Sequence, residues 1–169
     1  MAHAGDFSLL LASVGEVFGL SIPAGRCLAG IWRAAEPPCA DDLTAALGLS
    51  RSNVSTALKE LRDWGLVSRV RAPGDRKEYF AAPADPWDLA RIVIAARRRR
   101  QIAPLLDRLL AYEAETGDAR AAALHSMLAT VGEAMGRQAL MPAAELARHL
   151  SAADETASPA KKKKKKRKG

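Results

Sequence analysis

The stretch DLTAALGLSRSNVSTALKELRDWGLVSRVRAPGDRKEYF, residues 42–80, contains the clearest structural pattern in the chain. Apolar residues recur at helical spacing from Asp42 to Leu47, and Gly48 then supplies a residue that readily adopts the left-handed conformation at a helix end. Ser50 is a favourable N-cap for a second helix, which we predict over 51–63. The sequence therefore predicts two helices joined by a sharp turn.

The second predicted helix has one apolar and one polar side. Four apolar residues fall at intervals of three and four and are expected to face the core: Val54, Ala57, Leu58 and Leu61. The polar residues of this helix that could reach base edges or phosphates are Arg51, Ser52, Asn53, Ser55, Thr56 and Lys59. The alternative is an ordinary amphipathic helix whose polar side is only solvated.

The residues after this helix favour the first interpretation. Trp64-Gly65 ends the helix, 66–70 alternates like a strand, 72–75 has turn chemistry, and 78–80 begins a return strand. This hairpin carries four basic side chains suited to phosphates or a narrow minor groove: Arg69, Arg71, Arg76 and Lys77. Residues 21–84 are therefore predicted to form a DNA-binding winged helix-turn-helix, in which the basic hairpin is the wing and the helix over 51–63 is the recognition helix.

The flanking segments are predicted to be helical, which makes the fold mainly α with a two-stranded β wing. Four helices are expected over 6–18, from Ser21 to about 32–35, from Asp85-Pro86 up to about Thr116, and over 118–140. A short final helix is expected after Pro142 and should end at about Leu150. Pro104 should kink or split the long helix that starts at Asp85. The segments 1–20 and 85–150 contain more apolar surface than the winged helix can cover, so we expect them to be dimerisation helices; a monomeric helical cap is the alternative.

The net charge of +7 comes from the C-terminal end of the chain. Eight of the 26 Lys and Arg lie in 161–168, so residues 1–160 hold 18 basic against 19 acidic side chains. Residues 151–169 are expected to be a disordered Lys-rich tail. Its cations should bind DNA without sequence preference: Lys161, Lys162, Lys163, Lys164, Lys165, Lys166, Arg167 and Lys168.

Other functional classes lack support in the residues. Cys27 and Cys39 have no metal-ligand spacing, and the three histidines are isolated. We therefore expect no enzymatic activity, no metal site and no cofactor. Cys27 is expected to be a buried inert thiol, with redox sensing as the alternative. The early apolar run is soon broken by polar residues, which argues against a signal peptide or a membrane span and predicts a cytoplasmic, nucleoid-associated protein.

Four motifs together resemble the GbsR branch of the MarR-like bacterial transcriptional regulators. They are GRCLAG at 25–30, LGLSRSNVS at 47–55, LRDWGLV at 61–67 and PGDRKEYF at 73–80, and the likeness spans roughly residues 19–110. The resemblance implies a homodimer on a palindromic operator, terminal helices at the dimer interface, and modulation by a small-molecule effector. Because this branch is associated with choline sensing, an aromatic cage could be formed by Trp32, Trp64 and Trp87, with core or interface packing as the alternative.

Three functions follow from these observations. The first is a sequence-specific DNA-binding transcriptional regulator of bacterial type. The second is an architectural, nucleoid-associated DNA binder driven by the Lys-rich tail. The third is a protein-interaction module that uses the winged helix on another protein.

The run from Arg97 to Arg100 is assigned to none of these functions, because consecutive helical residues point in different directions and at most one or two could contact phosphates.

Overall fold

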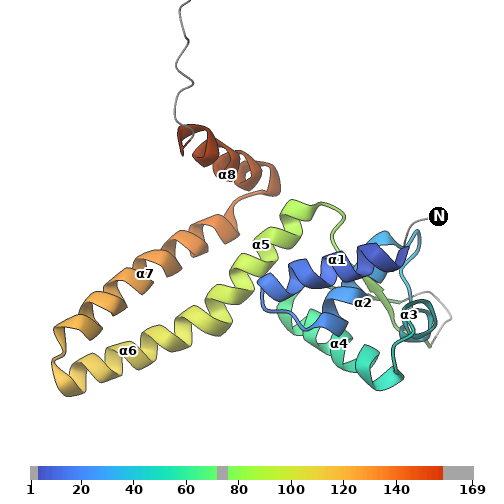
Figure 1. Cartoon of the computed structure of the whole chain (residues 1–169), viewed down its shortest axis with the longest axis horizontal. Helices are drawn as coiled ribbons and strands as arrows, with labels where there is room; N and C mark the ends of the chain where they lie inside the picture. Colours follow the sequence, from blue (N-terminus) through green and yellow to red (C-terminus); the bar gives the residue numbers. More distant parts are fainter. Residues whose placement is uncertain (1–3, 72–75, 158–169) are drawn as a thin grey trace, which may run out of the picture.

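The computed structural model describes residues 4–71 and 76–157 and is mostly helical, with one two-stranded antiparallel sheet. The side-chain surroundings of residues 7–71 and 76–152 are described. A winged-helix module forms one end of the molecule, and a helical arm extends away from it (Figure 1). This arrangement confirms the predicted fold class.

The module begins with α1 (Ala4–Val17), α2 (Ile22–Arg33), α3 (Ala40–Leu47) and α4 (Arg51–Trp64). The helix ends lie where local chemistry predicts them. The Ser50 hydroxyl accepts the Asn53 N–H at the start of α4, and Gly48 and Gly65 end α3 and α4 with φ values of 61° and 83°. These positive φ values favour glycine because it has no Cβ.

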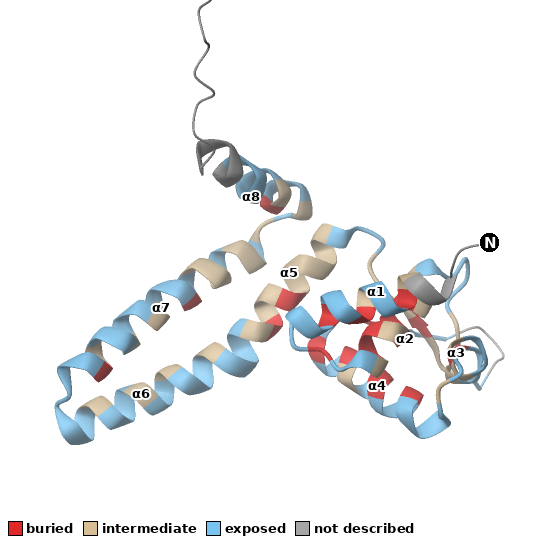
Figure 2. Cartoon of the chain, in the orientation of Figure 1, coloured by how far each residue is buried: buried red, intermediate tan, exposed pale blue. Residues whose placement is uncertain are grey.

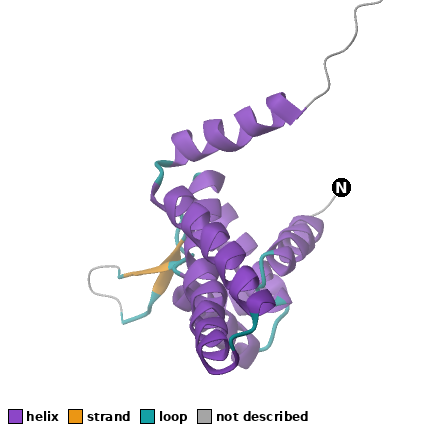
Figure 3. Cartoon of the chain, turned by 90° about the vertical axis from the view of Figure 1, so that its left-hand side faces the viewer, coloured by secondary structure: helices purple, strands orange, loops and turns teal. Residues whose placement is uncertain are grey.

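The wing consists of β1 (Ser68–Val70) and β2 (Tyr79–Ala81). The strands are antiparallel, with Ser68 opposite Ala81 and Val70 opposite Tyr79. The first strand is shorter than the predicted 66–70, because Leu66 and Val67 are buried in the core rather than paired across the sheet. Figure 3 shows the two strands projecting from the helical body.

The core lies inside the module. The largest fully buried side chains there include Val54, Leu61 and Leu66, with Cys27 beside them. Val54, Ala57, Leu58 and Leu61 are all buried, which confirms the predicted core side of α4. Buried residues are concentrated in the module, and few appear in the arm (Figure 2).

The arm consists of α5 (Pro86–Arg97), η1 (Arg98–Ile102), α6 (Ala103–Thr116), α7 (Ala119–Leu140) and α8 (Ala143–Ala157). Asp85 caps α5, and Asp118 caps α7 through backbone N–H groups. The segment η1 is a π-helical turn in which the Ala103 N–H bonds to the Arg98 carbonyl. The predicted interruption at Pro104 therefore takes the form of a wider turn immediately before the proline, which has no N–H to donate.

The C-terminal helix corrects one expectation. Helix α8 continues to Ala157, whereas the sequence predicts that the final helix ends at about Leu150 and that a disordered tail follows. The residues beyond 150 include Ala152, Ala153 and Glu155, which are good helix formers, so a helix that has already started at Ala143 can propagate through them. The lysine-rich segment 161–168 lies outside the described residues.

Candidate nucleic-acid interface

Helix α4 presents a continuous polar surface on the side opposite the core. All six residues proposed from the sequence are exposed: Arg51, Ser52, Asn53, Ser55, Thr56 and Lys59. They are held there because the buried residues of the same helix fix its rotation against α2. The N-terminal end of α4, where Ser50 caps the helix, carries the first three of them. The hydroxyl, amide and cationic groups of this surface are of the kinds that contact base edges and phosphates in a major groove.

Two cations of this surface have acidic partners that the sequence analysis did not identify. The Arg51 guanidinium lies 2.8 Å from the Asp41 carboxylate of α3, and the Lys59 ammonium lies 2.6 Å from the Asp63 carboxylate one turn later. The hydrogen bond from Lys59 is the main cause that lowers the pKa of Asp63, with help from nearby arginines. Both pairs are exposed, so each is weak and a phosphate can compete for the cation.

The wing brings the remaining predicted cations close to one another. Arg69 makes an ion pair with Glu78 across the hairpin at 2.9 Å, so it also holds the two strands together. Arg71, Arg76 and Lys77 are exposed and flank the turn at 72–75, which lies outside the described residues. The structure therefore places Arg71 and Arg76 at the same end of the wing, as the sequence predicts.

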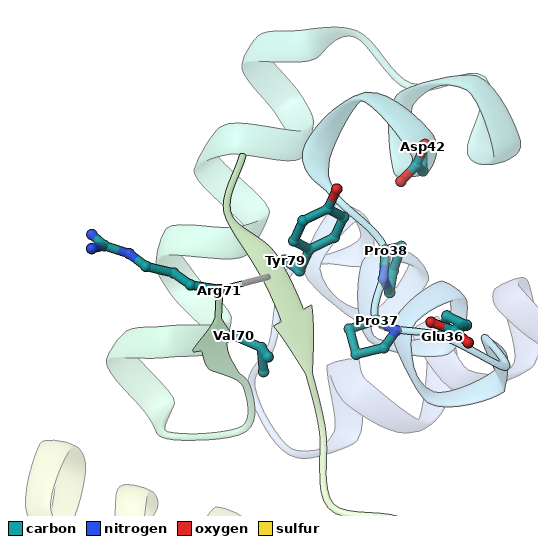
Figure 4. A pocket seen from close by; sticks show the side chains of 7 residues that line it. All are labelled: Glu36, Pro37, Pro38, Asp42, Val70, Arg71 and Tyr79. Atoms are coloured by element: carbon teal, nitrogen blue, oxygen red, sulfur yellow. The ribbon is translucent and has the colours of Figure 1, made fainter. Parts of the chain in front are cut away.

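A groove of about 610 Å³ lies between the wing and the link from α2 to α3. Its lining residues are Glu36, Pro37, Pro38, Asp42, Val70, Arg71 and Tyr79 (Figure 4). Figure 4 shows the Arg71 side chain extending away from Tyr79 and the prolines. Because the groove contains the carboxylates of Glu36 and Asp42, it is unsuited to a phosphate group. The Arg71 guanidinium points away from these groove residues (Figure 4).

One of those carboxylates has a structural role. The Cys39 N–H donates to Asp42 Oδ2 at 2.9 Å, which satisfies a free donor at the start of α3. This hydrogen bond is the main cause that lowers the pKa of Asp42 below its ordinary value of 3.8. Asp42 therefore stays ionised at neutral pH and fixes the first helix of the helix-turn-helix.

The four arginines at Arg97–Arg100 point in different directions, as expected for consecutive helical residues. Arg98 Nε donates to the Gly132 carbonyl at 2.9 Å, Arg99 Nη2 donates to the Asp63 carbonyl at 3.3 Å, and the Arg100 guanidinium lies 5.5 Å from the centre of the Trp64 ring. Three of the four arginines thus contact other helices of the same chain. No short-range sequence pattern connects them to those partners.

The tryptophans and Cys27 have separate environments. Trp32 donates to the Pro83 carbonyl at 2.9 Å and stacks on Phe7, while Trp64 is buried beneath Arg100. Trp32 and Trp64 therefore pack in different parts of the fold. Cys27 is fully buried, and burial raises the pKa of its thiol to about 11 despite the opposing charge of Arg26. This environment fits the inert-thiol interpretation.

The part of the chain that the structure describes contains no group of three His, Cys, Asp or Glu side chains arranged to hold a metal ion. Within the same ranges, no helix combines the length and hydrophobicity needed to cross a bilayer.

Residues 18–78 match the model of the MarR family. The matched segment contains α2, α3, α4 and β1 and ends just before β2, so it includes α4 and most of the wing. No curated protein sequence matches the chain.

The chain is also similar to solved structures. A crystal structure of a transcriptional regulator aligns with a TM-score of 0.64 and 24% identity, covering 88% of this chain and 98% of that one. MepR, a transcription regulator of the Staphylococcus aureus multidrug efflux pump MepA, aligns with a TM-score of 0.41 and 18% identity, covering 75% and 90% of the two chains. RV1404 from Mycobacterium tuberculosis aligns with a TM-score of 0.40 and 22% identity, covering 68% and 86%. The first of these similarities supports the fold of nearly the whole chain.

Proposed function

We propose that this chain, whose residues 18–78 carry a winged helix of the MarR family, is a sequence-specific DNA-binding transcriptional regulator without enzymatic activity. The observation that carries the proposal is the exposed polar surface of α4 beside the basic wing. In this proposal α4 enters the major groove, where Ser52, Asn53, Ser55 and Thr56 face base edges. Arg51 and Lys59 exchange their acidic partners for phosphates.

The wing is proposed to contact the duplex next to the major-groove site. Arg71 and Arg76 lie at its outer end, where they can follow the phosphate backbone or enter a narrow minor groove. Arg69 on β1 and Lys77 beside the turn add positive potential to the wing, although Arg69 is shared with Glu78. We therefore assign the main phosphate contacts of the wing to Arg71 and Arg76.

The working form is proposed to be a homodimer on a palindromic operator. None of residues 103–116, which form α6, is buried, although this helix carries Leu105, Leu110 and Tyr112. On α7, three exposed apolar residues, Leu124, Met127 and Val131, follow each other at helical spacing. A second copy of the chain would cover these surfaces, and its two-fold axis would match a two-fold operator.

Placement in the GbsR branch remains part of this proposal and rests on the sequence resemblance over residues 19–110. A small-molecule effector and a cytoplasmic, nucleoid-associated location belong to the same proposal. An aromatic cage is left out of the proposal, because Trp32 and Trp64 are engaged in separate packing contacts.

The test starts with selection of bound fragments from the source genome to obtain an operator. Substitution of Thr56→Ala, Lys59→Ala and Arg76→Ala together should lower operator affinity by at least about a hundredfold, since each well-made contact to a base or phosphate contributes on the order of 1 kcal/mol or more. The matched control is Thr116→Ala, Arg120→Ala and Arg148→Ala, which removes the same types of side chain from the arm. Equal operator binding by both triple variants would refute the assigned surface.

The architectural alternative is supported by the lysine-rich tail, and the specificity ratio separates it from a regulator. A regulator should prefer its operator over random duplex by about a thousandfold at physiological salt, whereas a tail-driven binder should show little preference. Deletion after Pro159 should weaken binding to all duplexes by a similar factor, because cations that contact only phosphates contribute affinity without selecting a sequence. If the tailless protein bound no DNA at all, the protein-interaction alternative would be favoured.

A further inference from the structure

We propose that Arg99 and Arg100 are positioning residues that hold the C-terminal end of α4 against the arm and thereby set how the recognition helix is presented to DNA. This inference rests on the proposed function, because it assigns α4 the role of reading DNA. It gives a purpose to an arginine run that the winged helix itself does not use.

The two arginines contact the last two residues of α4. Arg99 Nη2 donates to the Asp63 carbonyl at 3.3 Å, and the Arg100 guanidinium lies 5.5 Å from the centre of the Trp64 ring. Trp64 is only 5% exposed and belongs to the core of the module. A group that stacks on Trp64 is therefore held in a fixed position relative to that core. Gly65 ends the helix directly afterwards. The contacts therefore lie at the end of the helix and not on its DNA-facing side.

The end of a helix is a favourable place for guanidinium groups. The last carbonyls of a helix lack partners within the helix and carry the negative end of its dipole. Arg99 supplies a hydrogen-bond donor to one such carbonyl, and Arg100 adds a cation over an aromatic ring within the distance at which this attraction is significant. Both contacts stabilise the same arrangement of α4 relative to the arm.

The other side of the same turn is attached to α7. Arg98 Nε donates to the Gly132 carbonyl at 2.9 Å. Gly136 leaves room for this side chain, since a Cβ added to Gly136 would lie 3.1 Å from Arg98 Nε. The π-helical turn η1 thus connects α7 through Arg98 with α4 through Arg99 and Arg100. A shift of α7 against α5 would move the groups that hold the end of α4.

Direct contact with phosphates is the competing role for exposed arginines, and the salt dependence of binding distinguishes the two. A phosphate contact contributes about 0.9 to the slope of log affinity against log salt, and lysine can replace arginine as a point charge in such a contact. A positioning role changes affinity without changing the number of released counterions. It also depends on the reach and the planar shape of arginine, which lysine reproduces only in part.

The experiment compares Arg99→Ala/Arg100→Ala with the full-length wild type and with Arg108→Ala/Arg120→Ala, which removes the same charge from exposed positions of the arm. We expect operator affinity to fall about fivefold, because loss of both contacts reduces the fraction of molecules in which α4 is correctly presented. The salt slope should stay the same as in the control. Arg99→Lys/Arg100→Lys should recover only part of the affinity that the alanine variant loses.

Hydrogen exchange of the free protein supplies a readout that does not involve DNA. Backbone amides in the last turn of α4 should exchange faster in the alanine variant, while those of α2 keep their protection. If the alanine variant showed unchanged hydrogen exchange and unchanged operator affinity, the inference would be overturned. It would also be overturned if the alanine variant had a smaller salt slope of operator affinity and the lysine variant restored that slope. If the wild type showed no operator preference, the proposed function would fail, while the exchange result would still decide whether the arginines hold α4.

Discussion

The ion pair between Lys59 and Asp63 places a carboxylate beside a cation that we assign to DNA. The two groups lie 2.6 Å apart on the exposed side of α4. The pKa of Asp63 is lowered chiefly by the hydrogen bond from Lys59, so the carboxylate is ionised at neutral pH. Before Lys59 can contact a phosphate fully, this pair must open.

Replacement of Asp63 by Asn should therefore strengthen DNA binding. We expect a gain of several-fold at low salt that shrinks as salt increases, because a negative charge near the phosphates is removed and Lys59 is released. The folding stability should change little, since exposed pairs contribute little. Binding titrations at several salt concentrations check this outcome, with Asp107→Asn on the arm as control. Equal gains in both variants would show only an effect of net charge.

The Cys27 thiol should be unreactive in the folded protein. Burial raises its pKa to about 11, so roughly one molecule in a thousand carries the reactive thiolate at about pH 8. Iodoacetamide followed by mass spectrometry should modify Cys27 only when denaturant is added. Rapid modification of the native protein at neutral pH would instead support redox sensing.

The same shift predicts how stability responds to alkaline pH. Because the pKa of the folded protein is raised above the ordinary value of 9.0, the unfolded chain loses the Cys27 proton first. The stability associated with the neutral thiol is fully present below about pH 9 and is lost as the pH rises toward 11. A Cys27→Ala variant should lack this component in urea denaturation curves measured over that range.

At the scale of elements, the packing of α1 on α2 depends on Gly25. A Cβ at this position would lie 2.6 Å from the Cα of Ala12, which is backbone and cannot move without displacing α1. The exposed apolar residues of α1, including Leu10, Val14 and Val17, lie on a helix whose position is fixed by this close approach. The GRCLAG motif at 25–30 thus has a packing reason for its first glycine.

Gly25→Ala should destabilise the protein by about 1–3 kcal/mol, the usual cost of inserting volume where the surroundings cannot adjust. Gly30→Ala is the matched control, because its added Cβ would meet side-chain ends and no backbone: Leu43 at 2.9 Å and Leu47 at 3.7 Å. Leu43 can change its side-chain conformation, so a smaller loss is expected. Thermal or urea unfolding measures both, and a larger loss for Gly30→Ala would contradict this account of the α1–α2 contact.

At the scale of the whole molecule, the arm has too little core to stand alone in water. Of the 22 residues of α7, only Ala121 and Gly132 are buried, and α6 contributes none. The apolar line of Leu124, Met127 and Val131 is about half exposed. Burying such surface against a second copy is the arrangement that the hydrophobic effect favours.

Charged residues on this line should therefore dissociate the dimer. We expect Leu124→Glu/Val131→Glu to sediment as a monomer at concentrations where the wild type is dimeric, and to lose operator affinity because the two half-sites are no longer bound together. Ser126→Glu/Thr130→Glu places the same charges on exposed polar positions of α7 and should remain dimeric. A monomeric wild type would refute the dimer itself.

The sequence by itself determined the elements of the module and the surface proposed to read DNA. Ser50, Gly48, Gly65, Asp85 and Asp118 mark helix ends through contacts with neighbours a few residues away, so their effect can be predicted locally. The spacing of apolar residues also fixed which side of α4 is buried, and hence which polar side chains are exposed. The end of α8 was less predictable, because alanine-rich residues after Leu150 carry no strong stop signal.

Only the tertiary structure decided which partners Arg51 and the arginines 98–100 have. Arg51 meets Asp41 from the preceding helix, Arg99 and Arg100 meet the end of α4, and Arg98 meets α7. Sequence spacing cannot supply these pairs, because the residues are far apart along the chain and four consecutive arginines look alike until the turn that carries them is placed between two helices. Their separate roles arise from long-range packing, which local propensity does not encode.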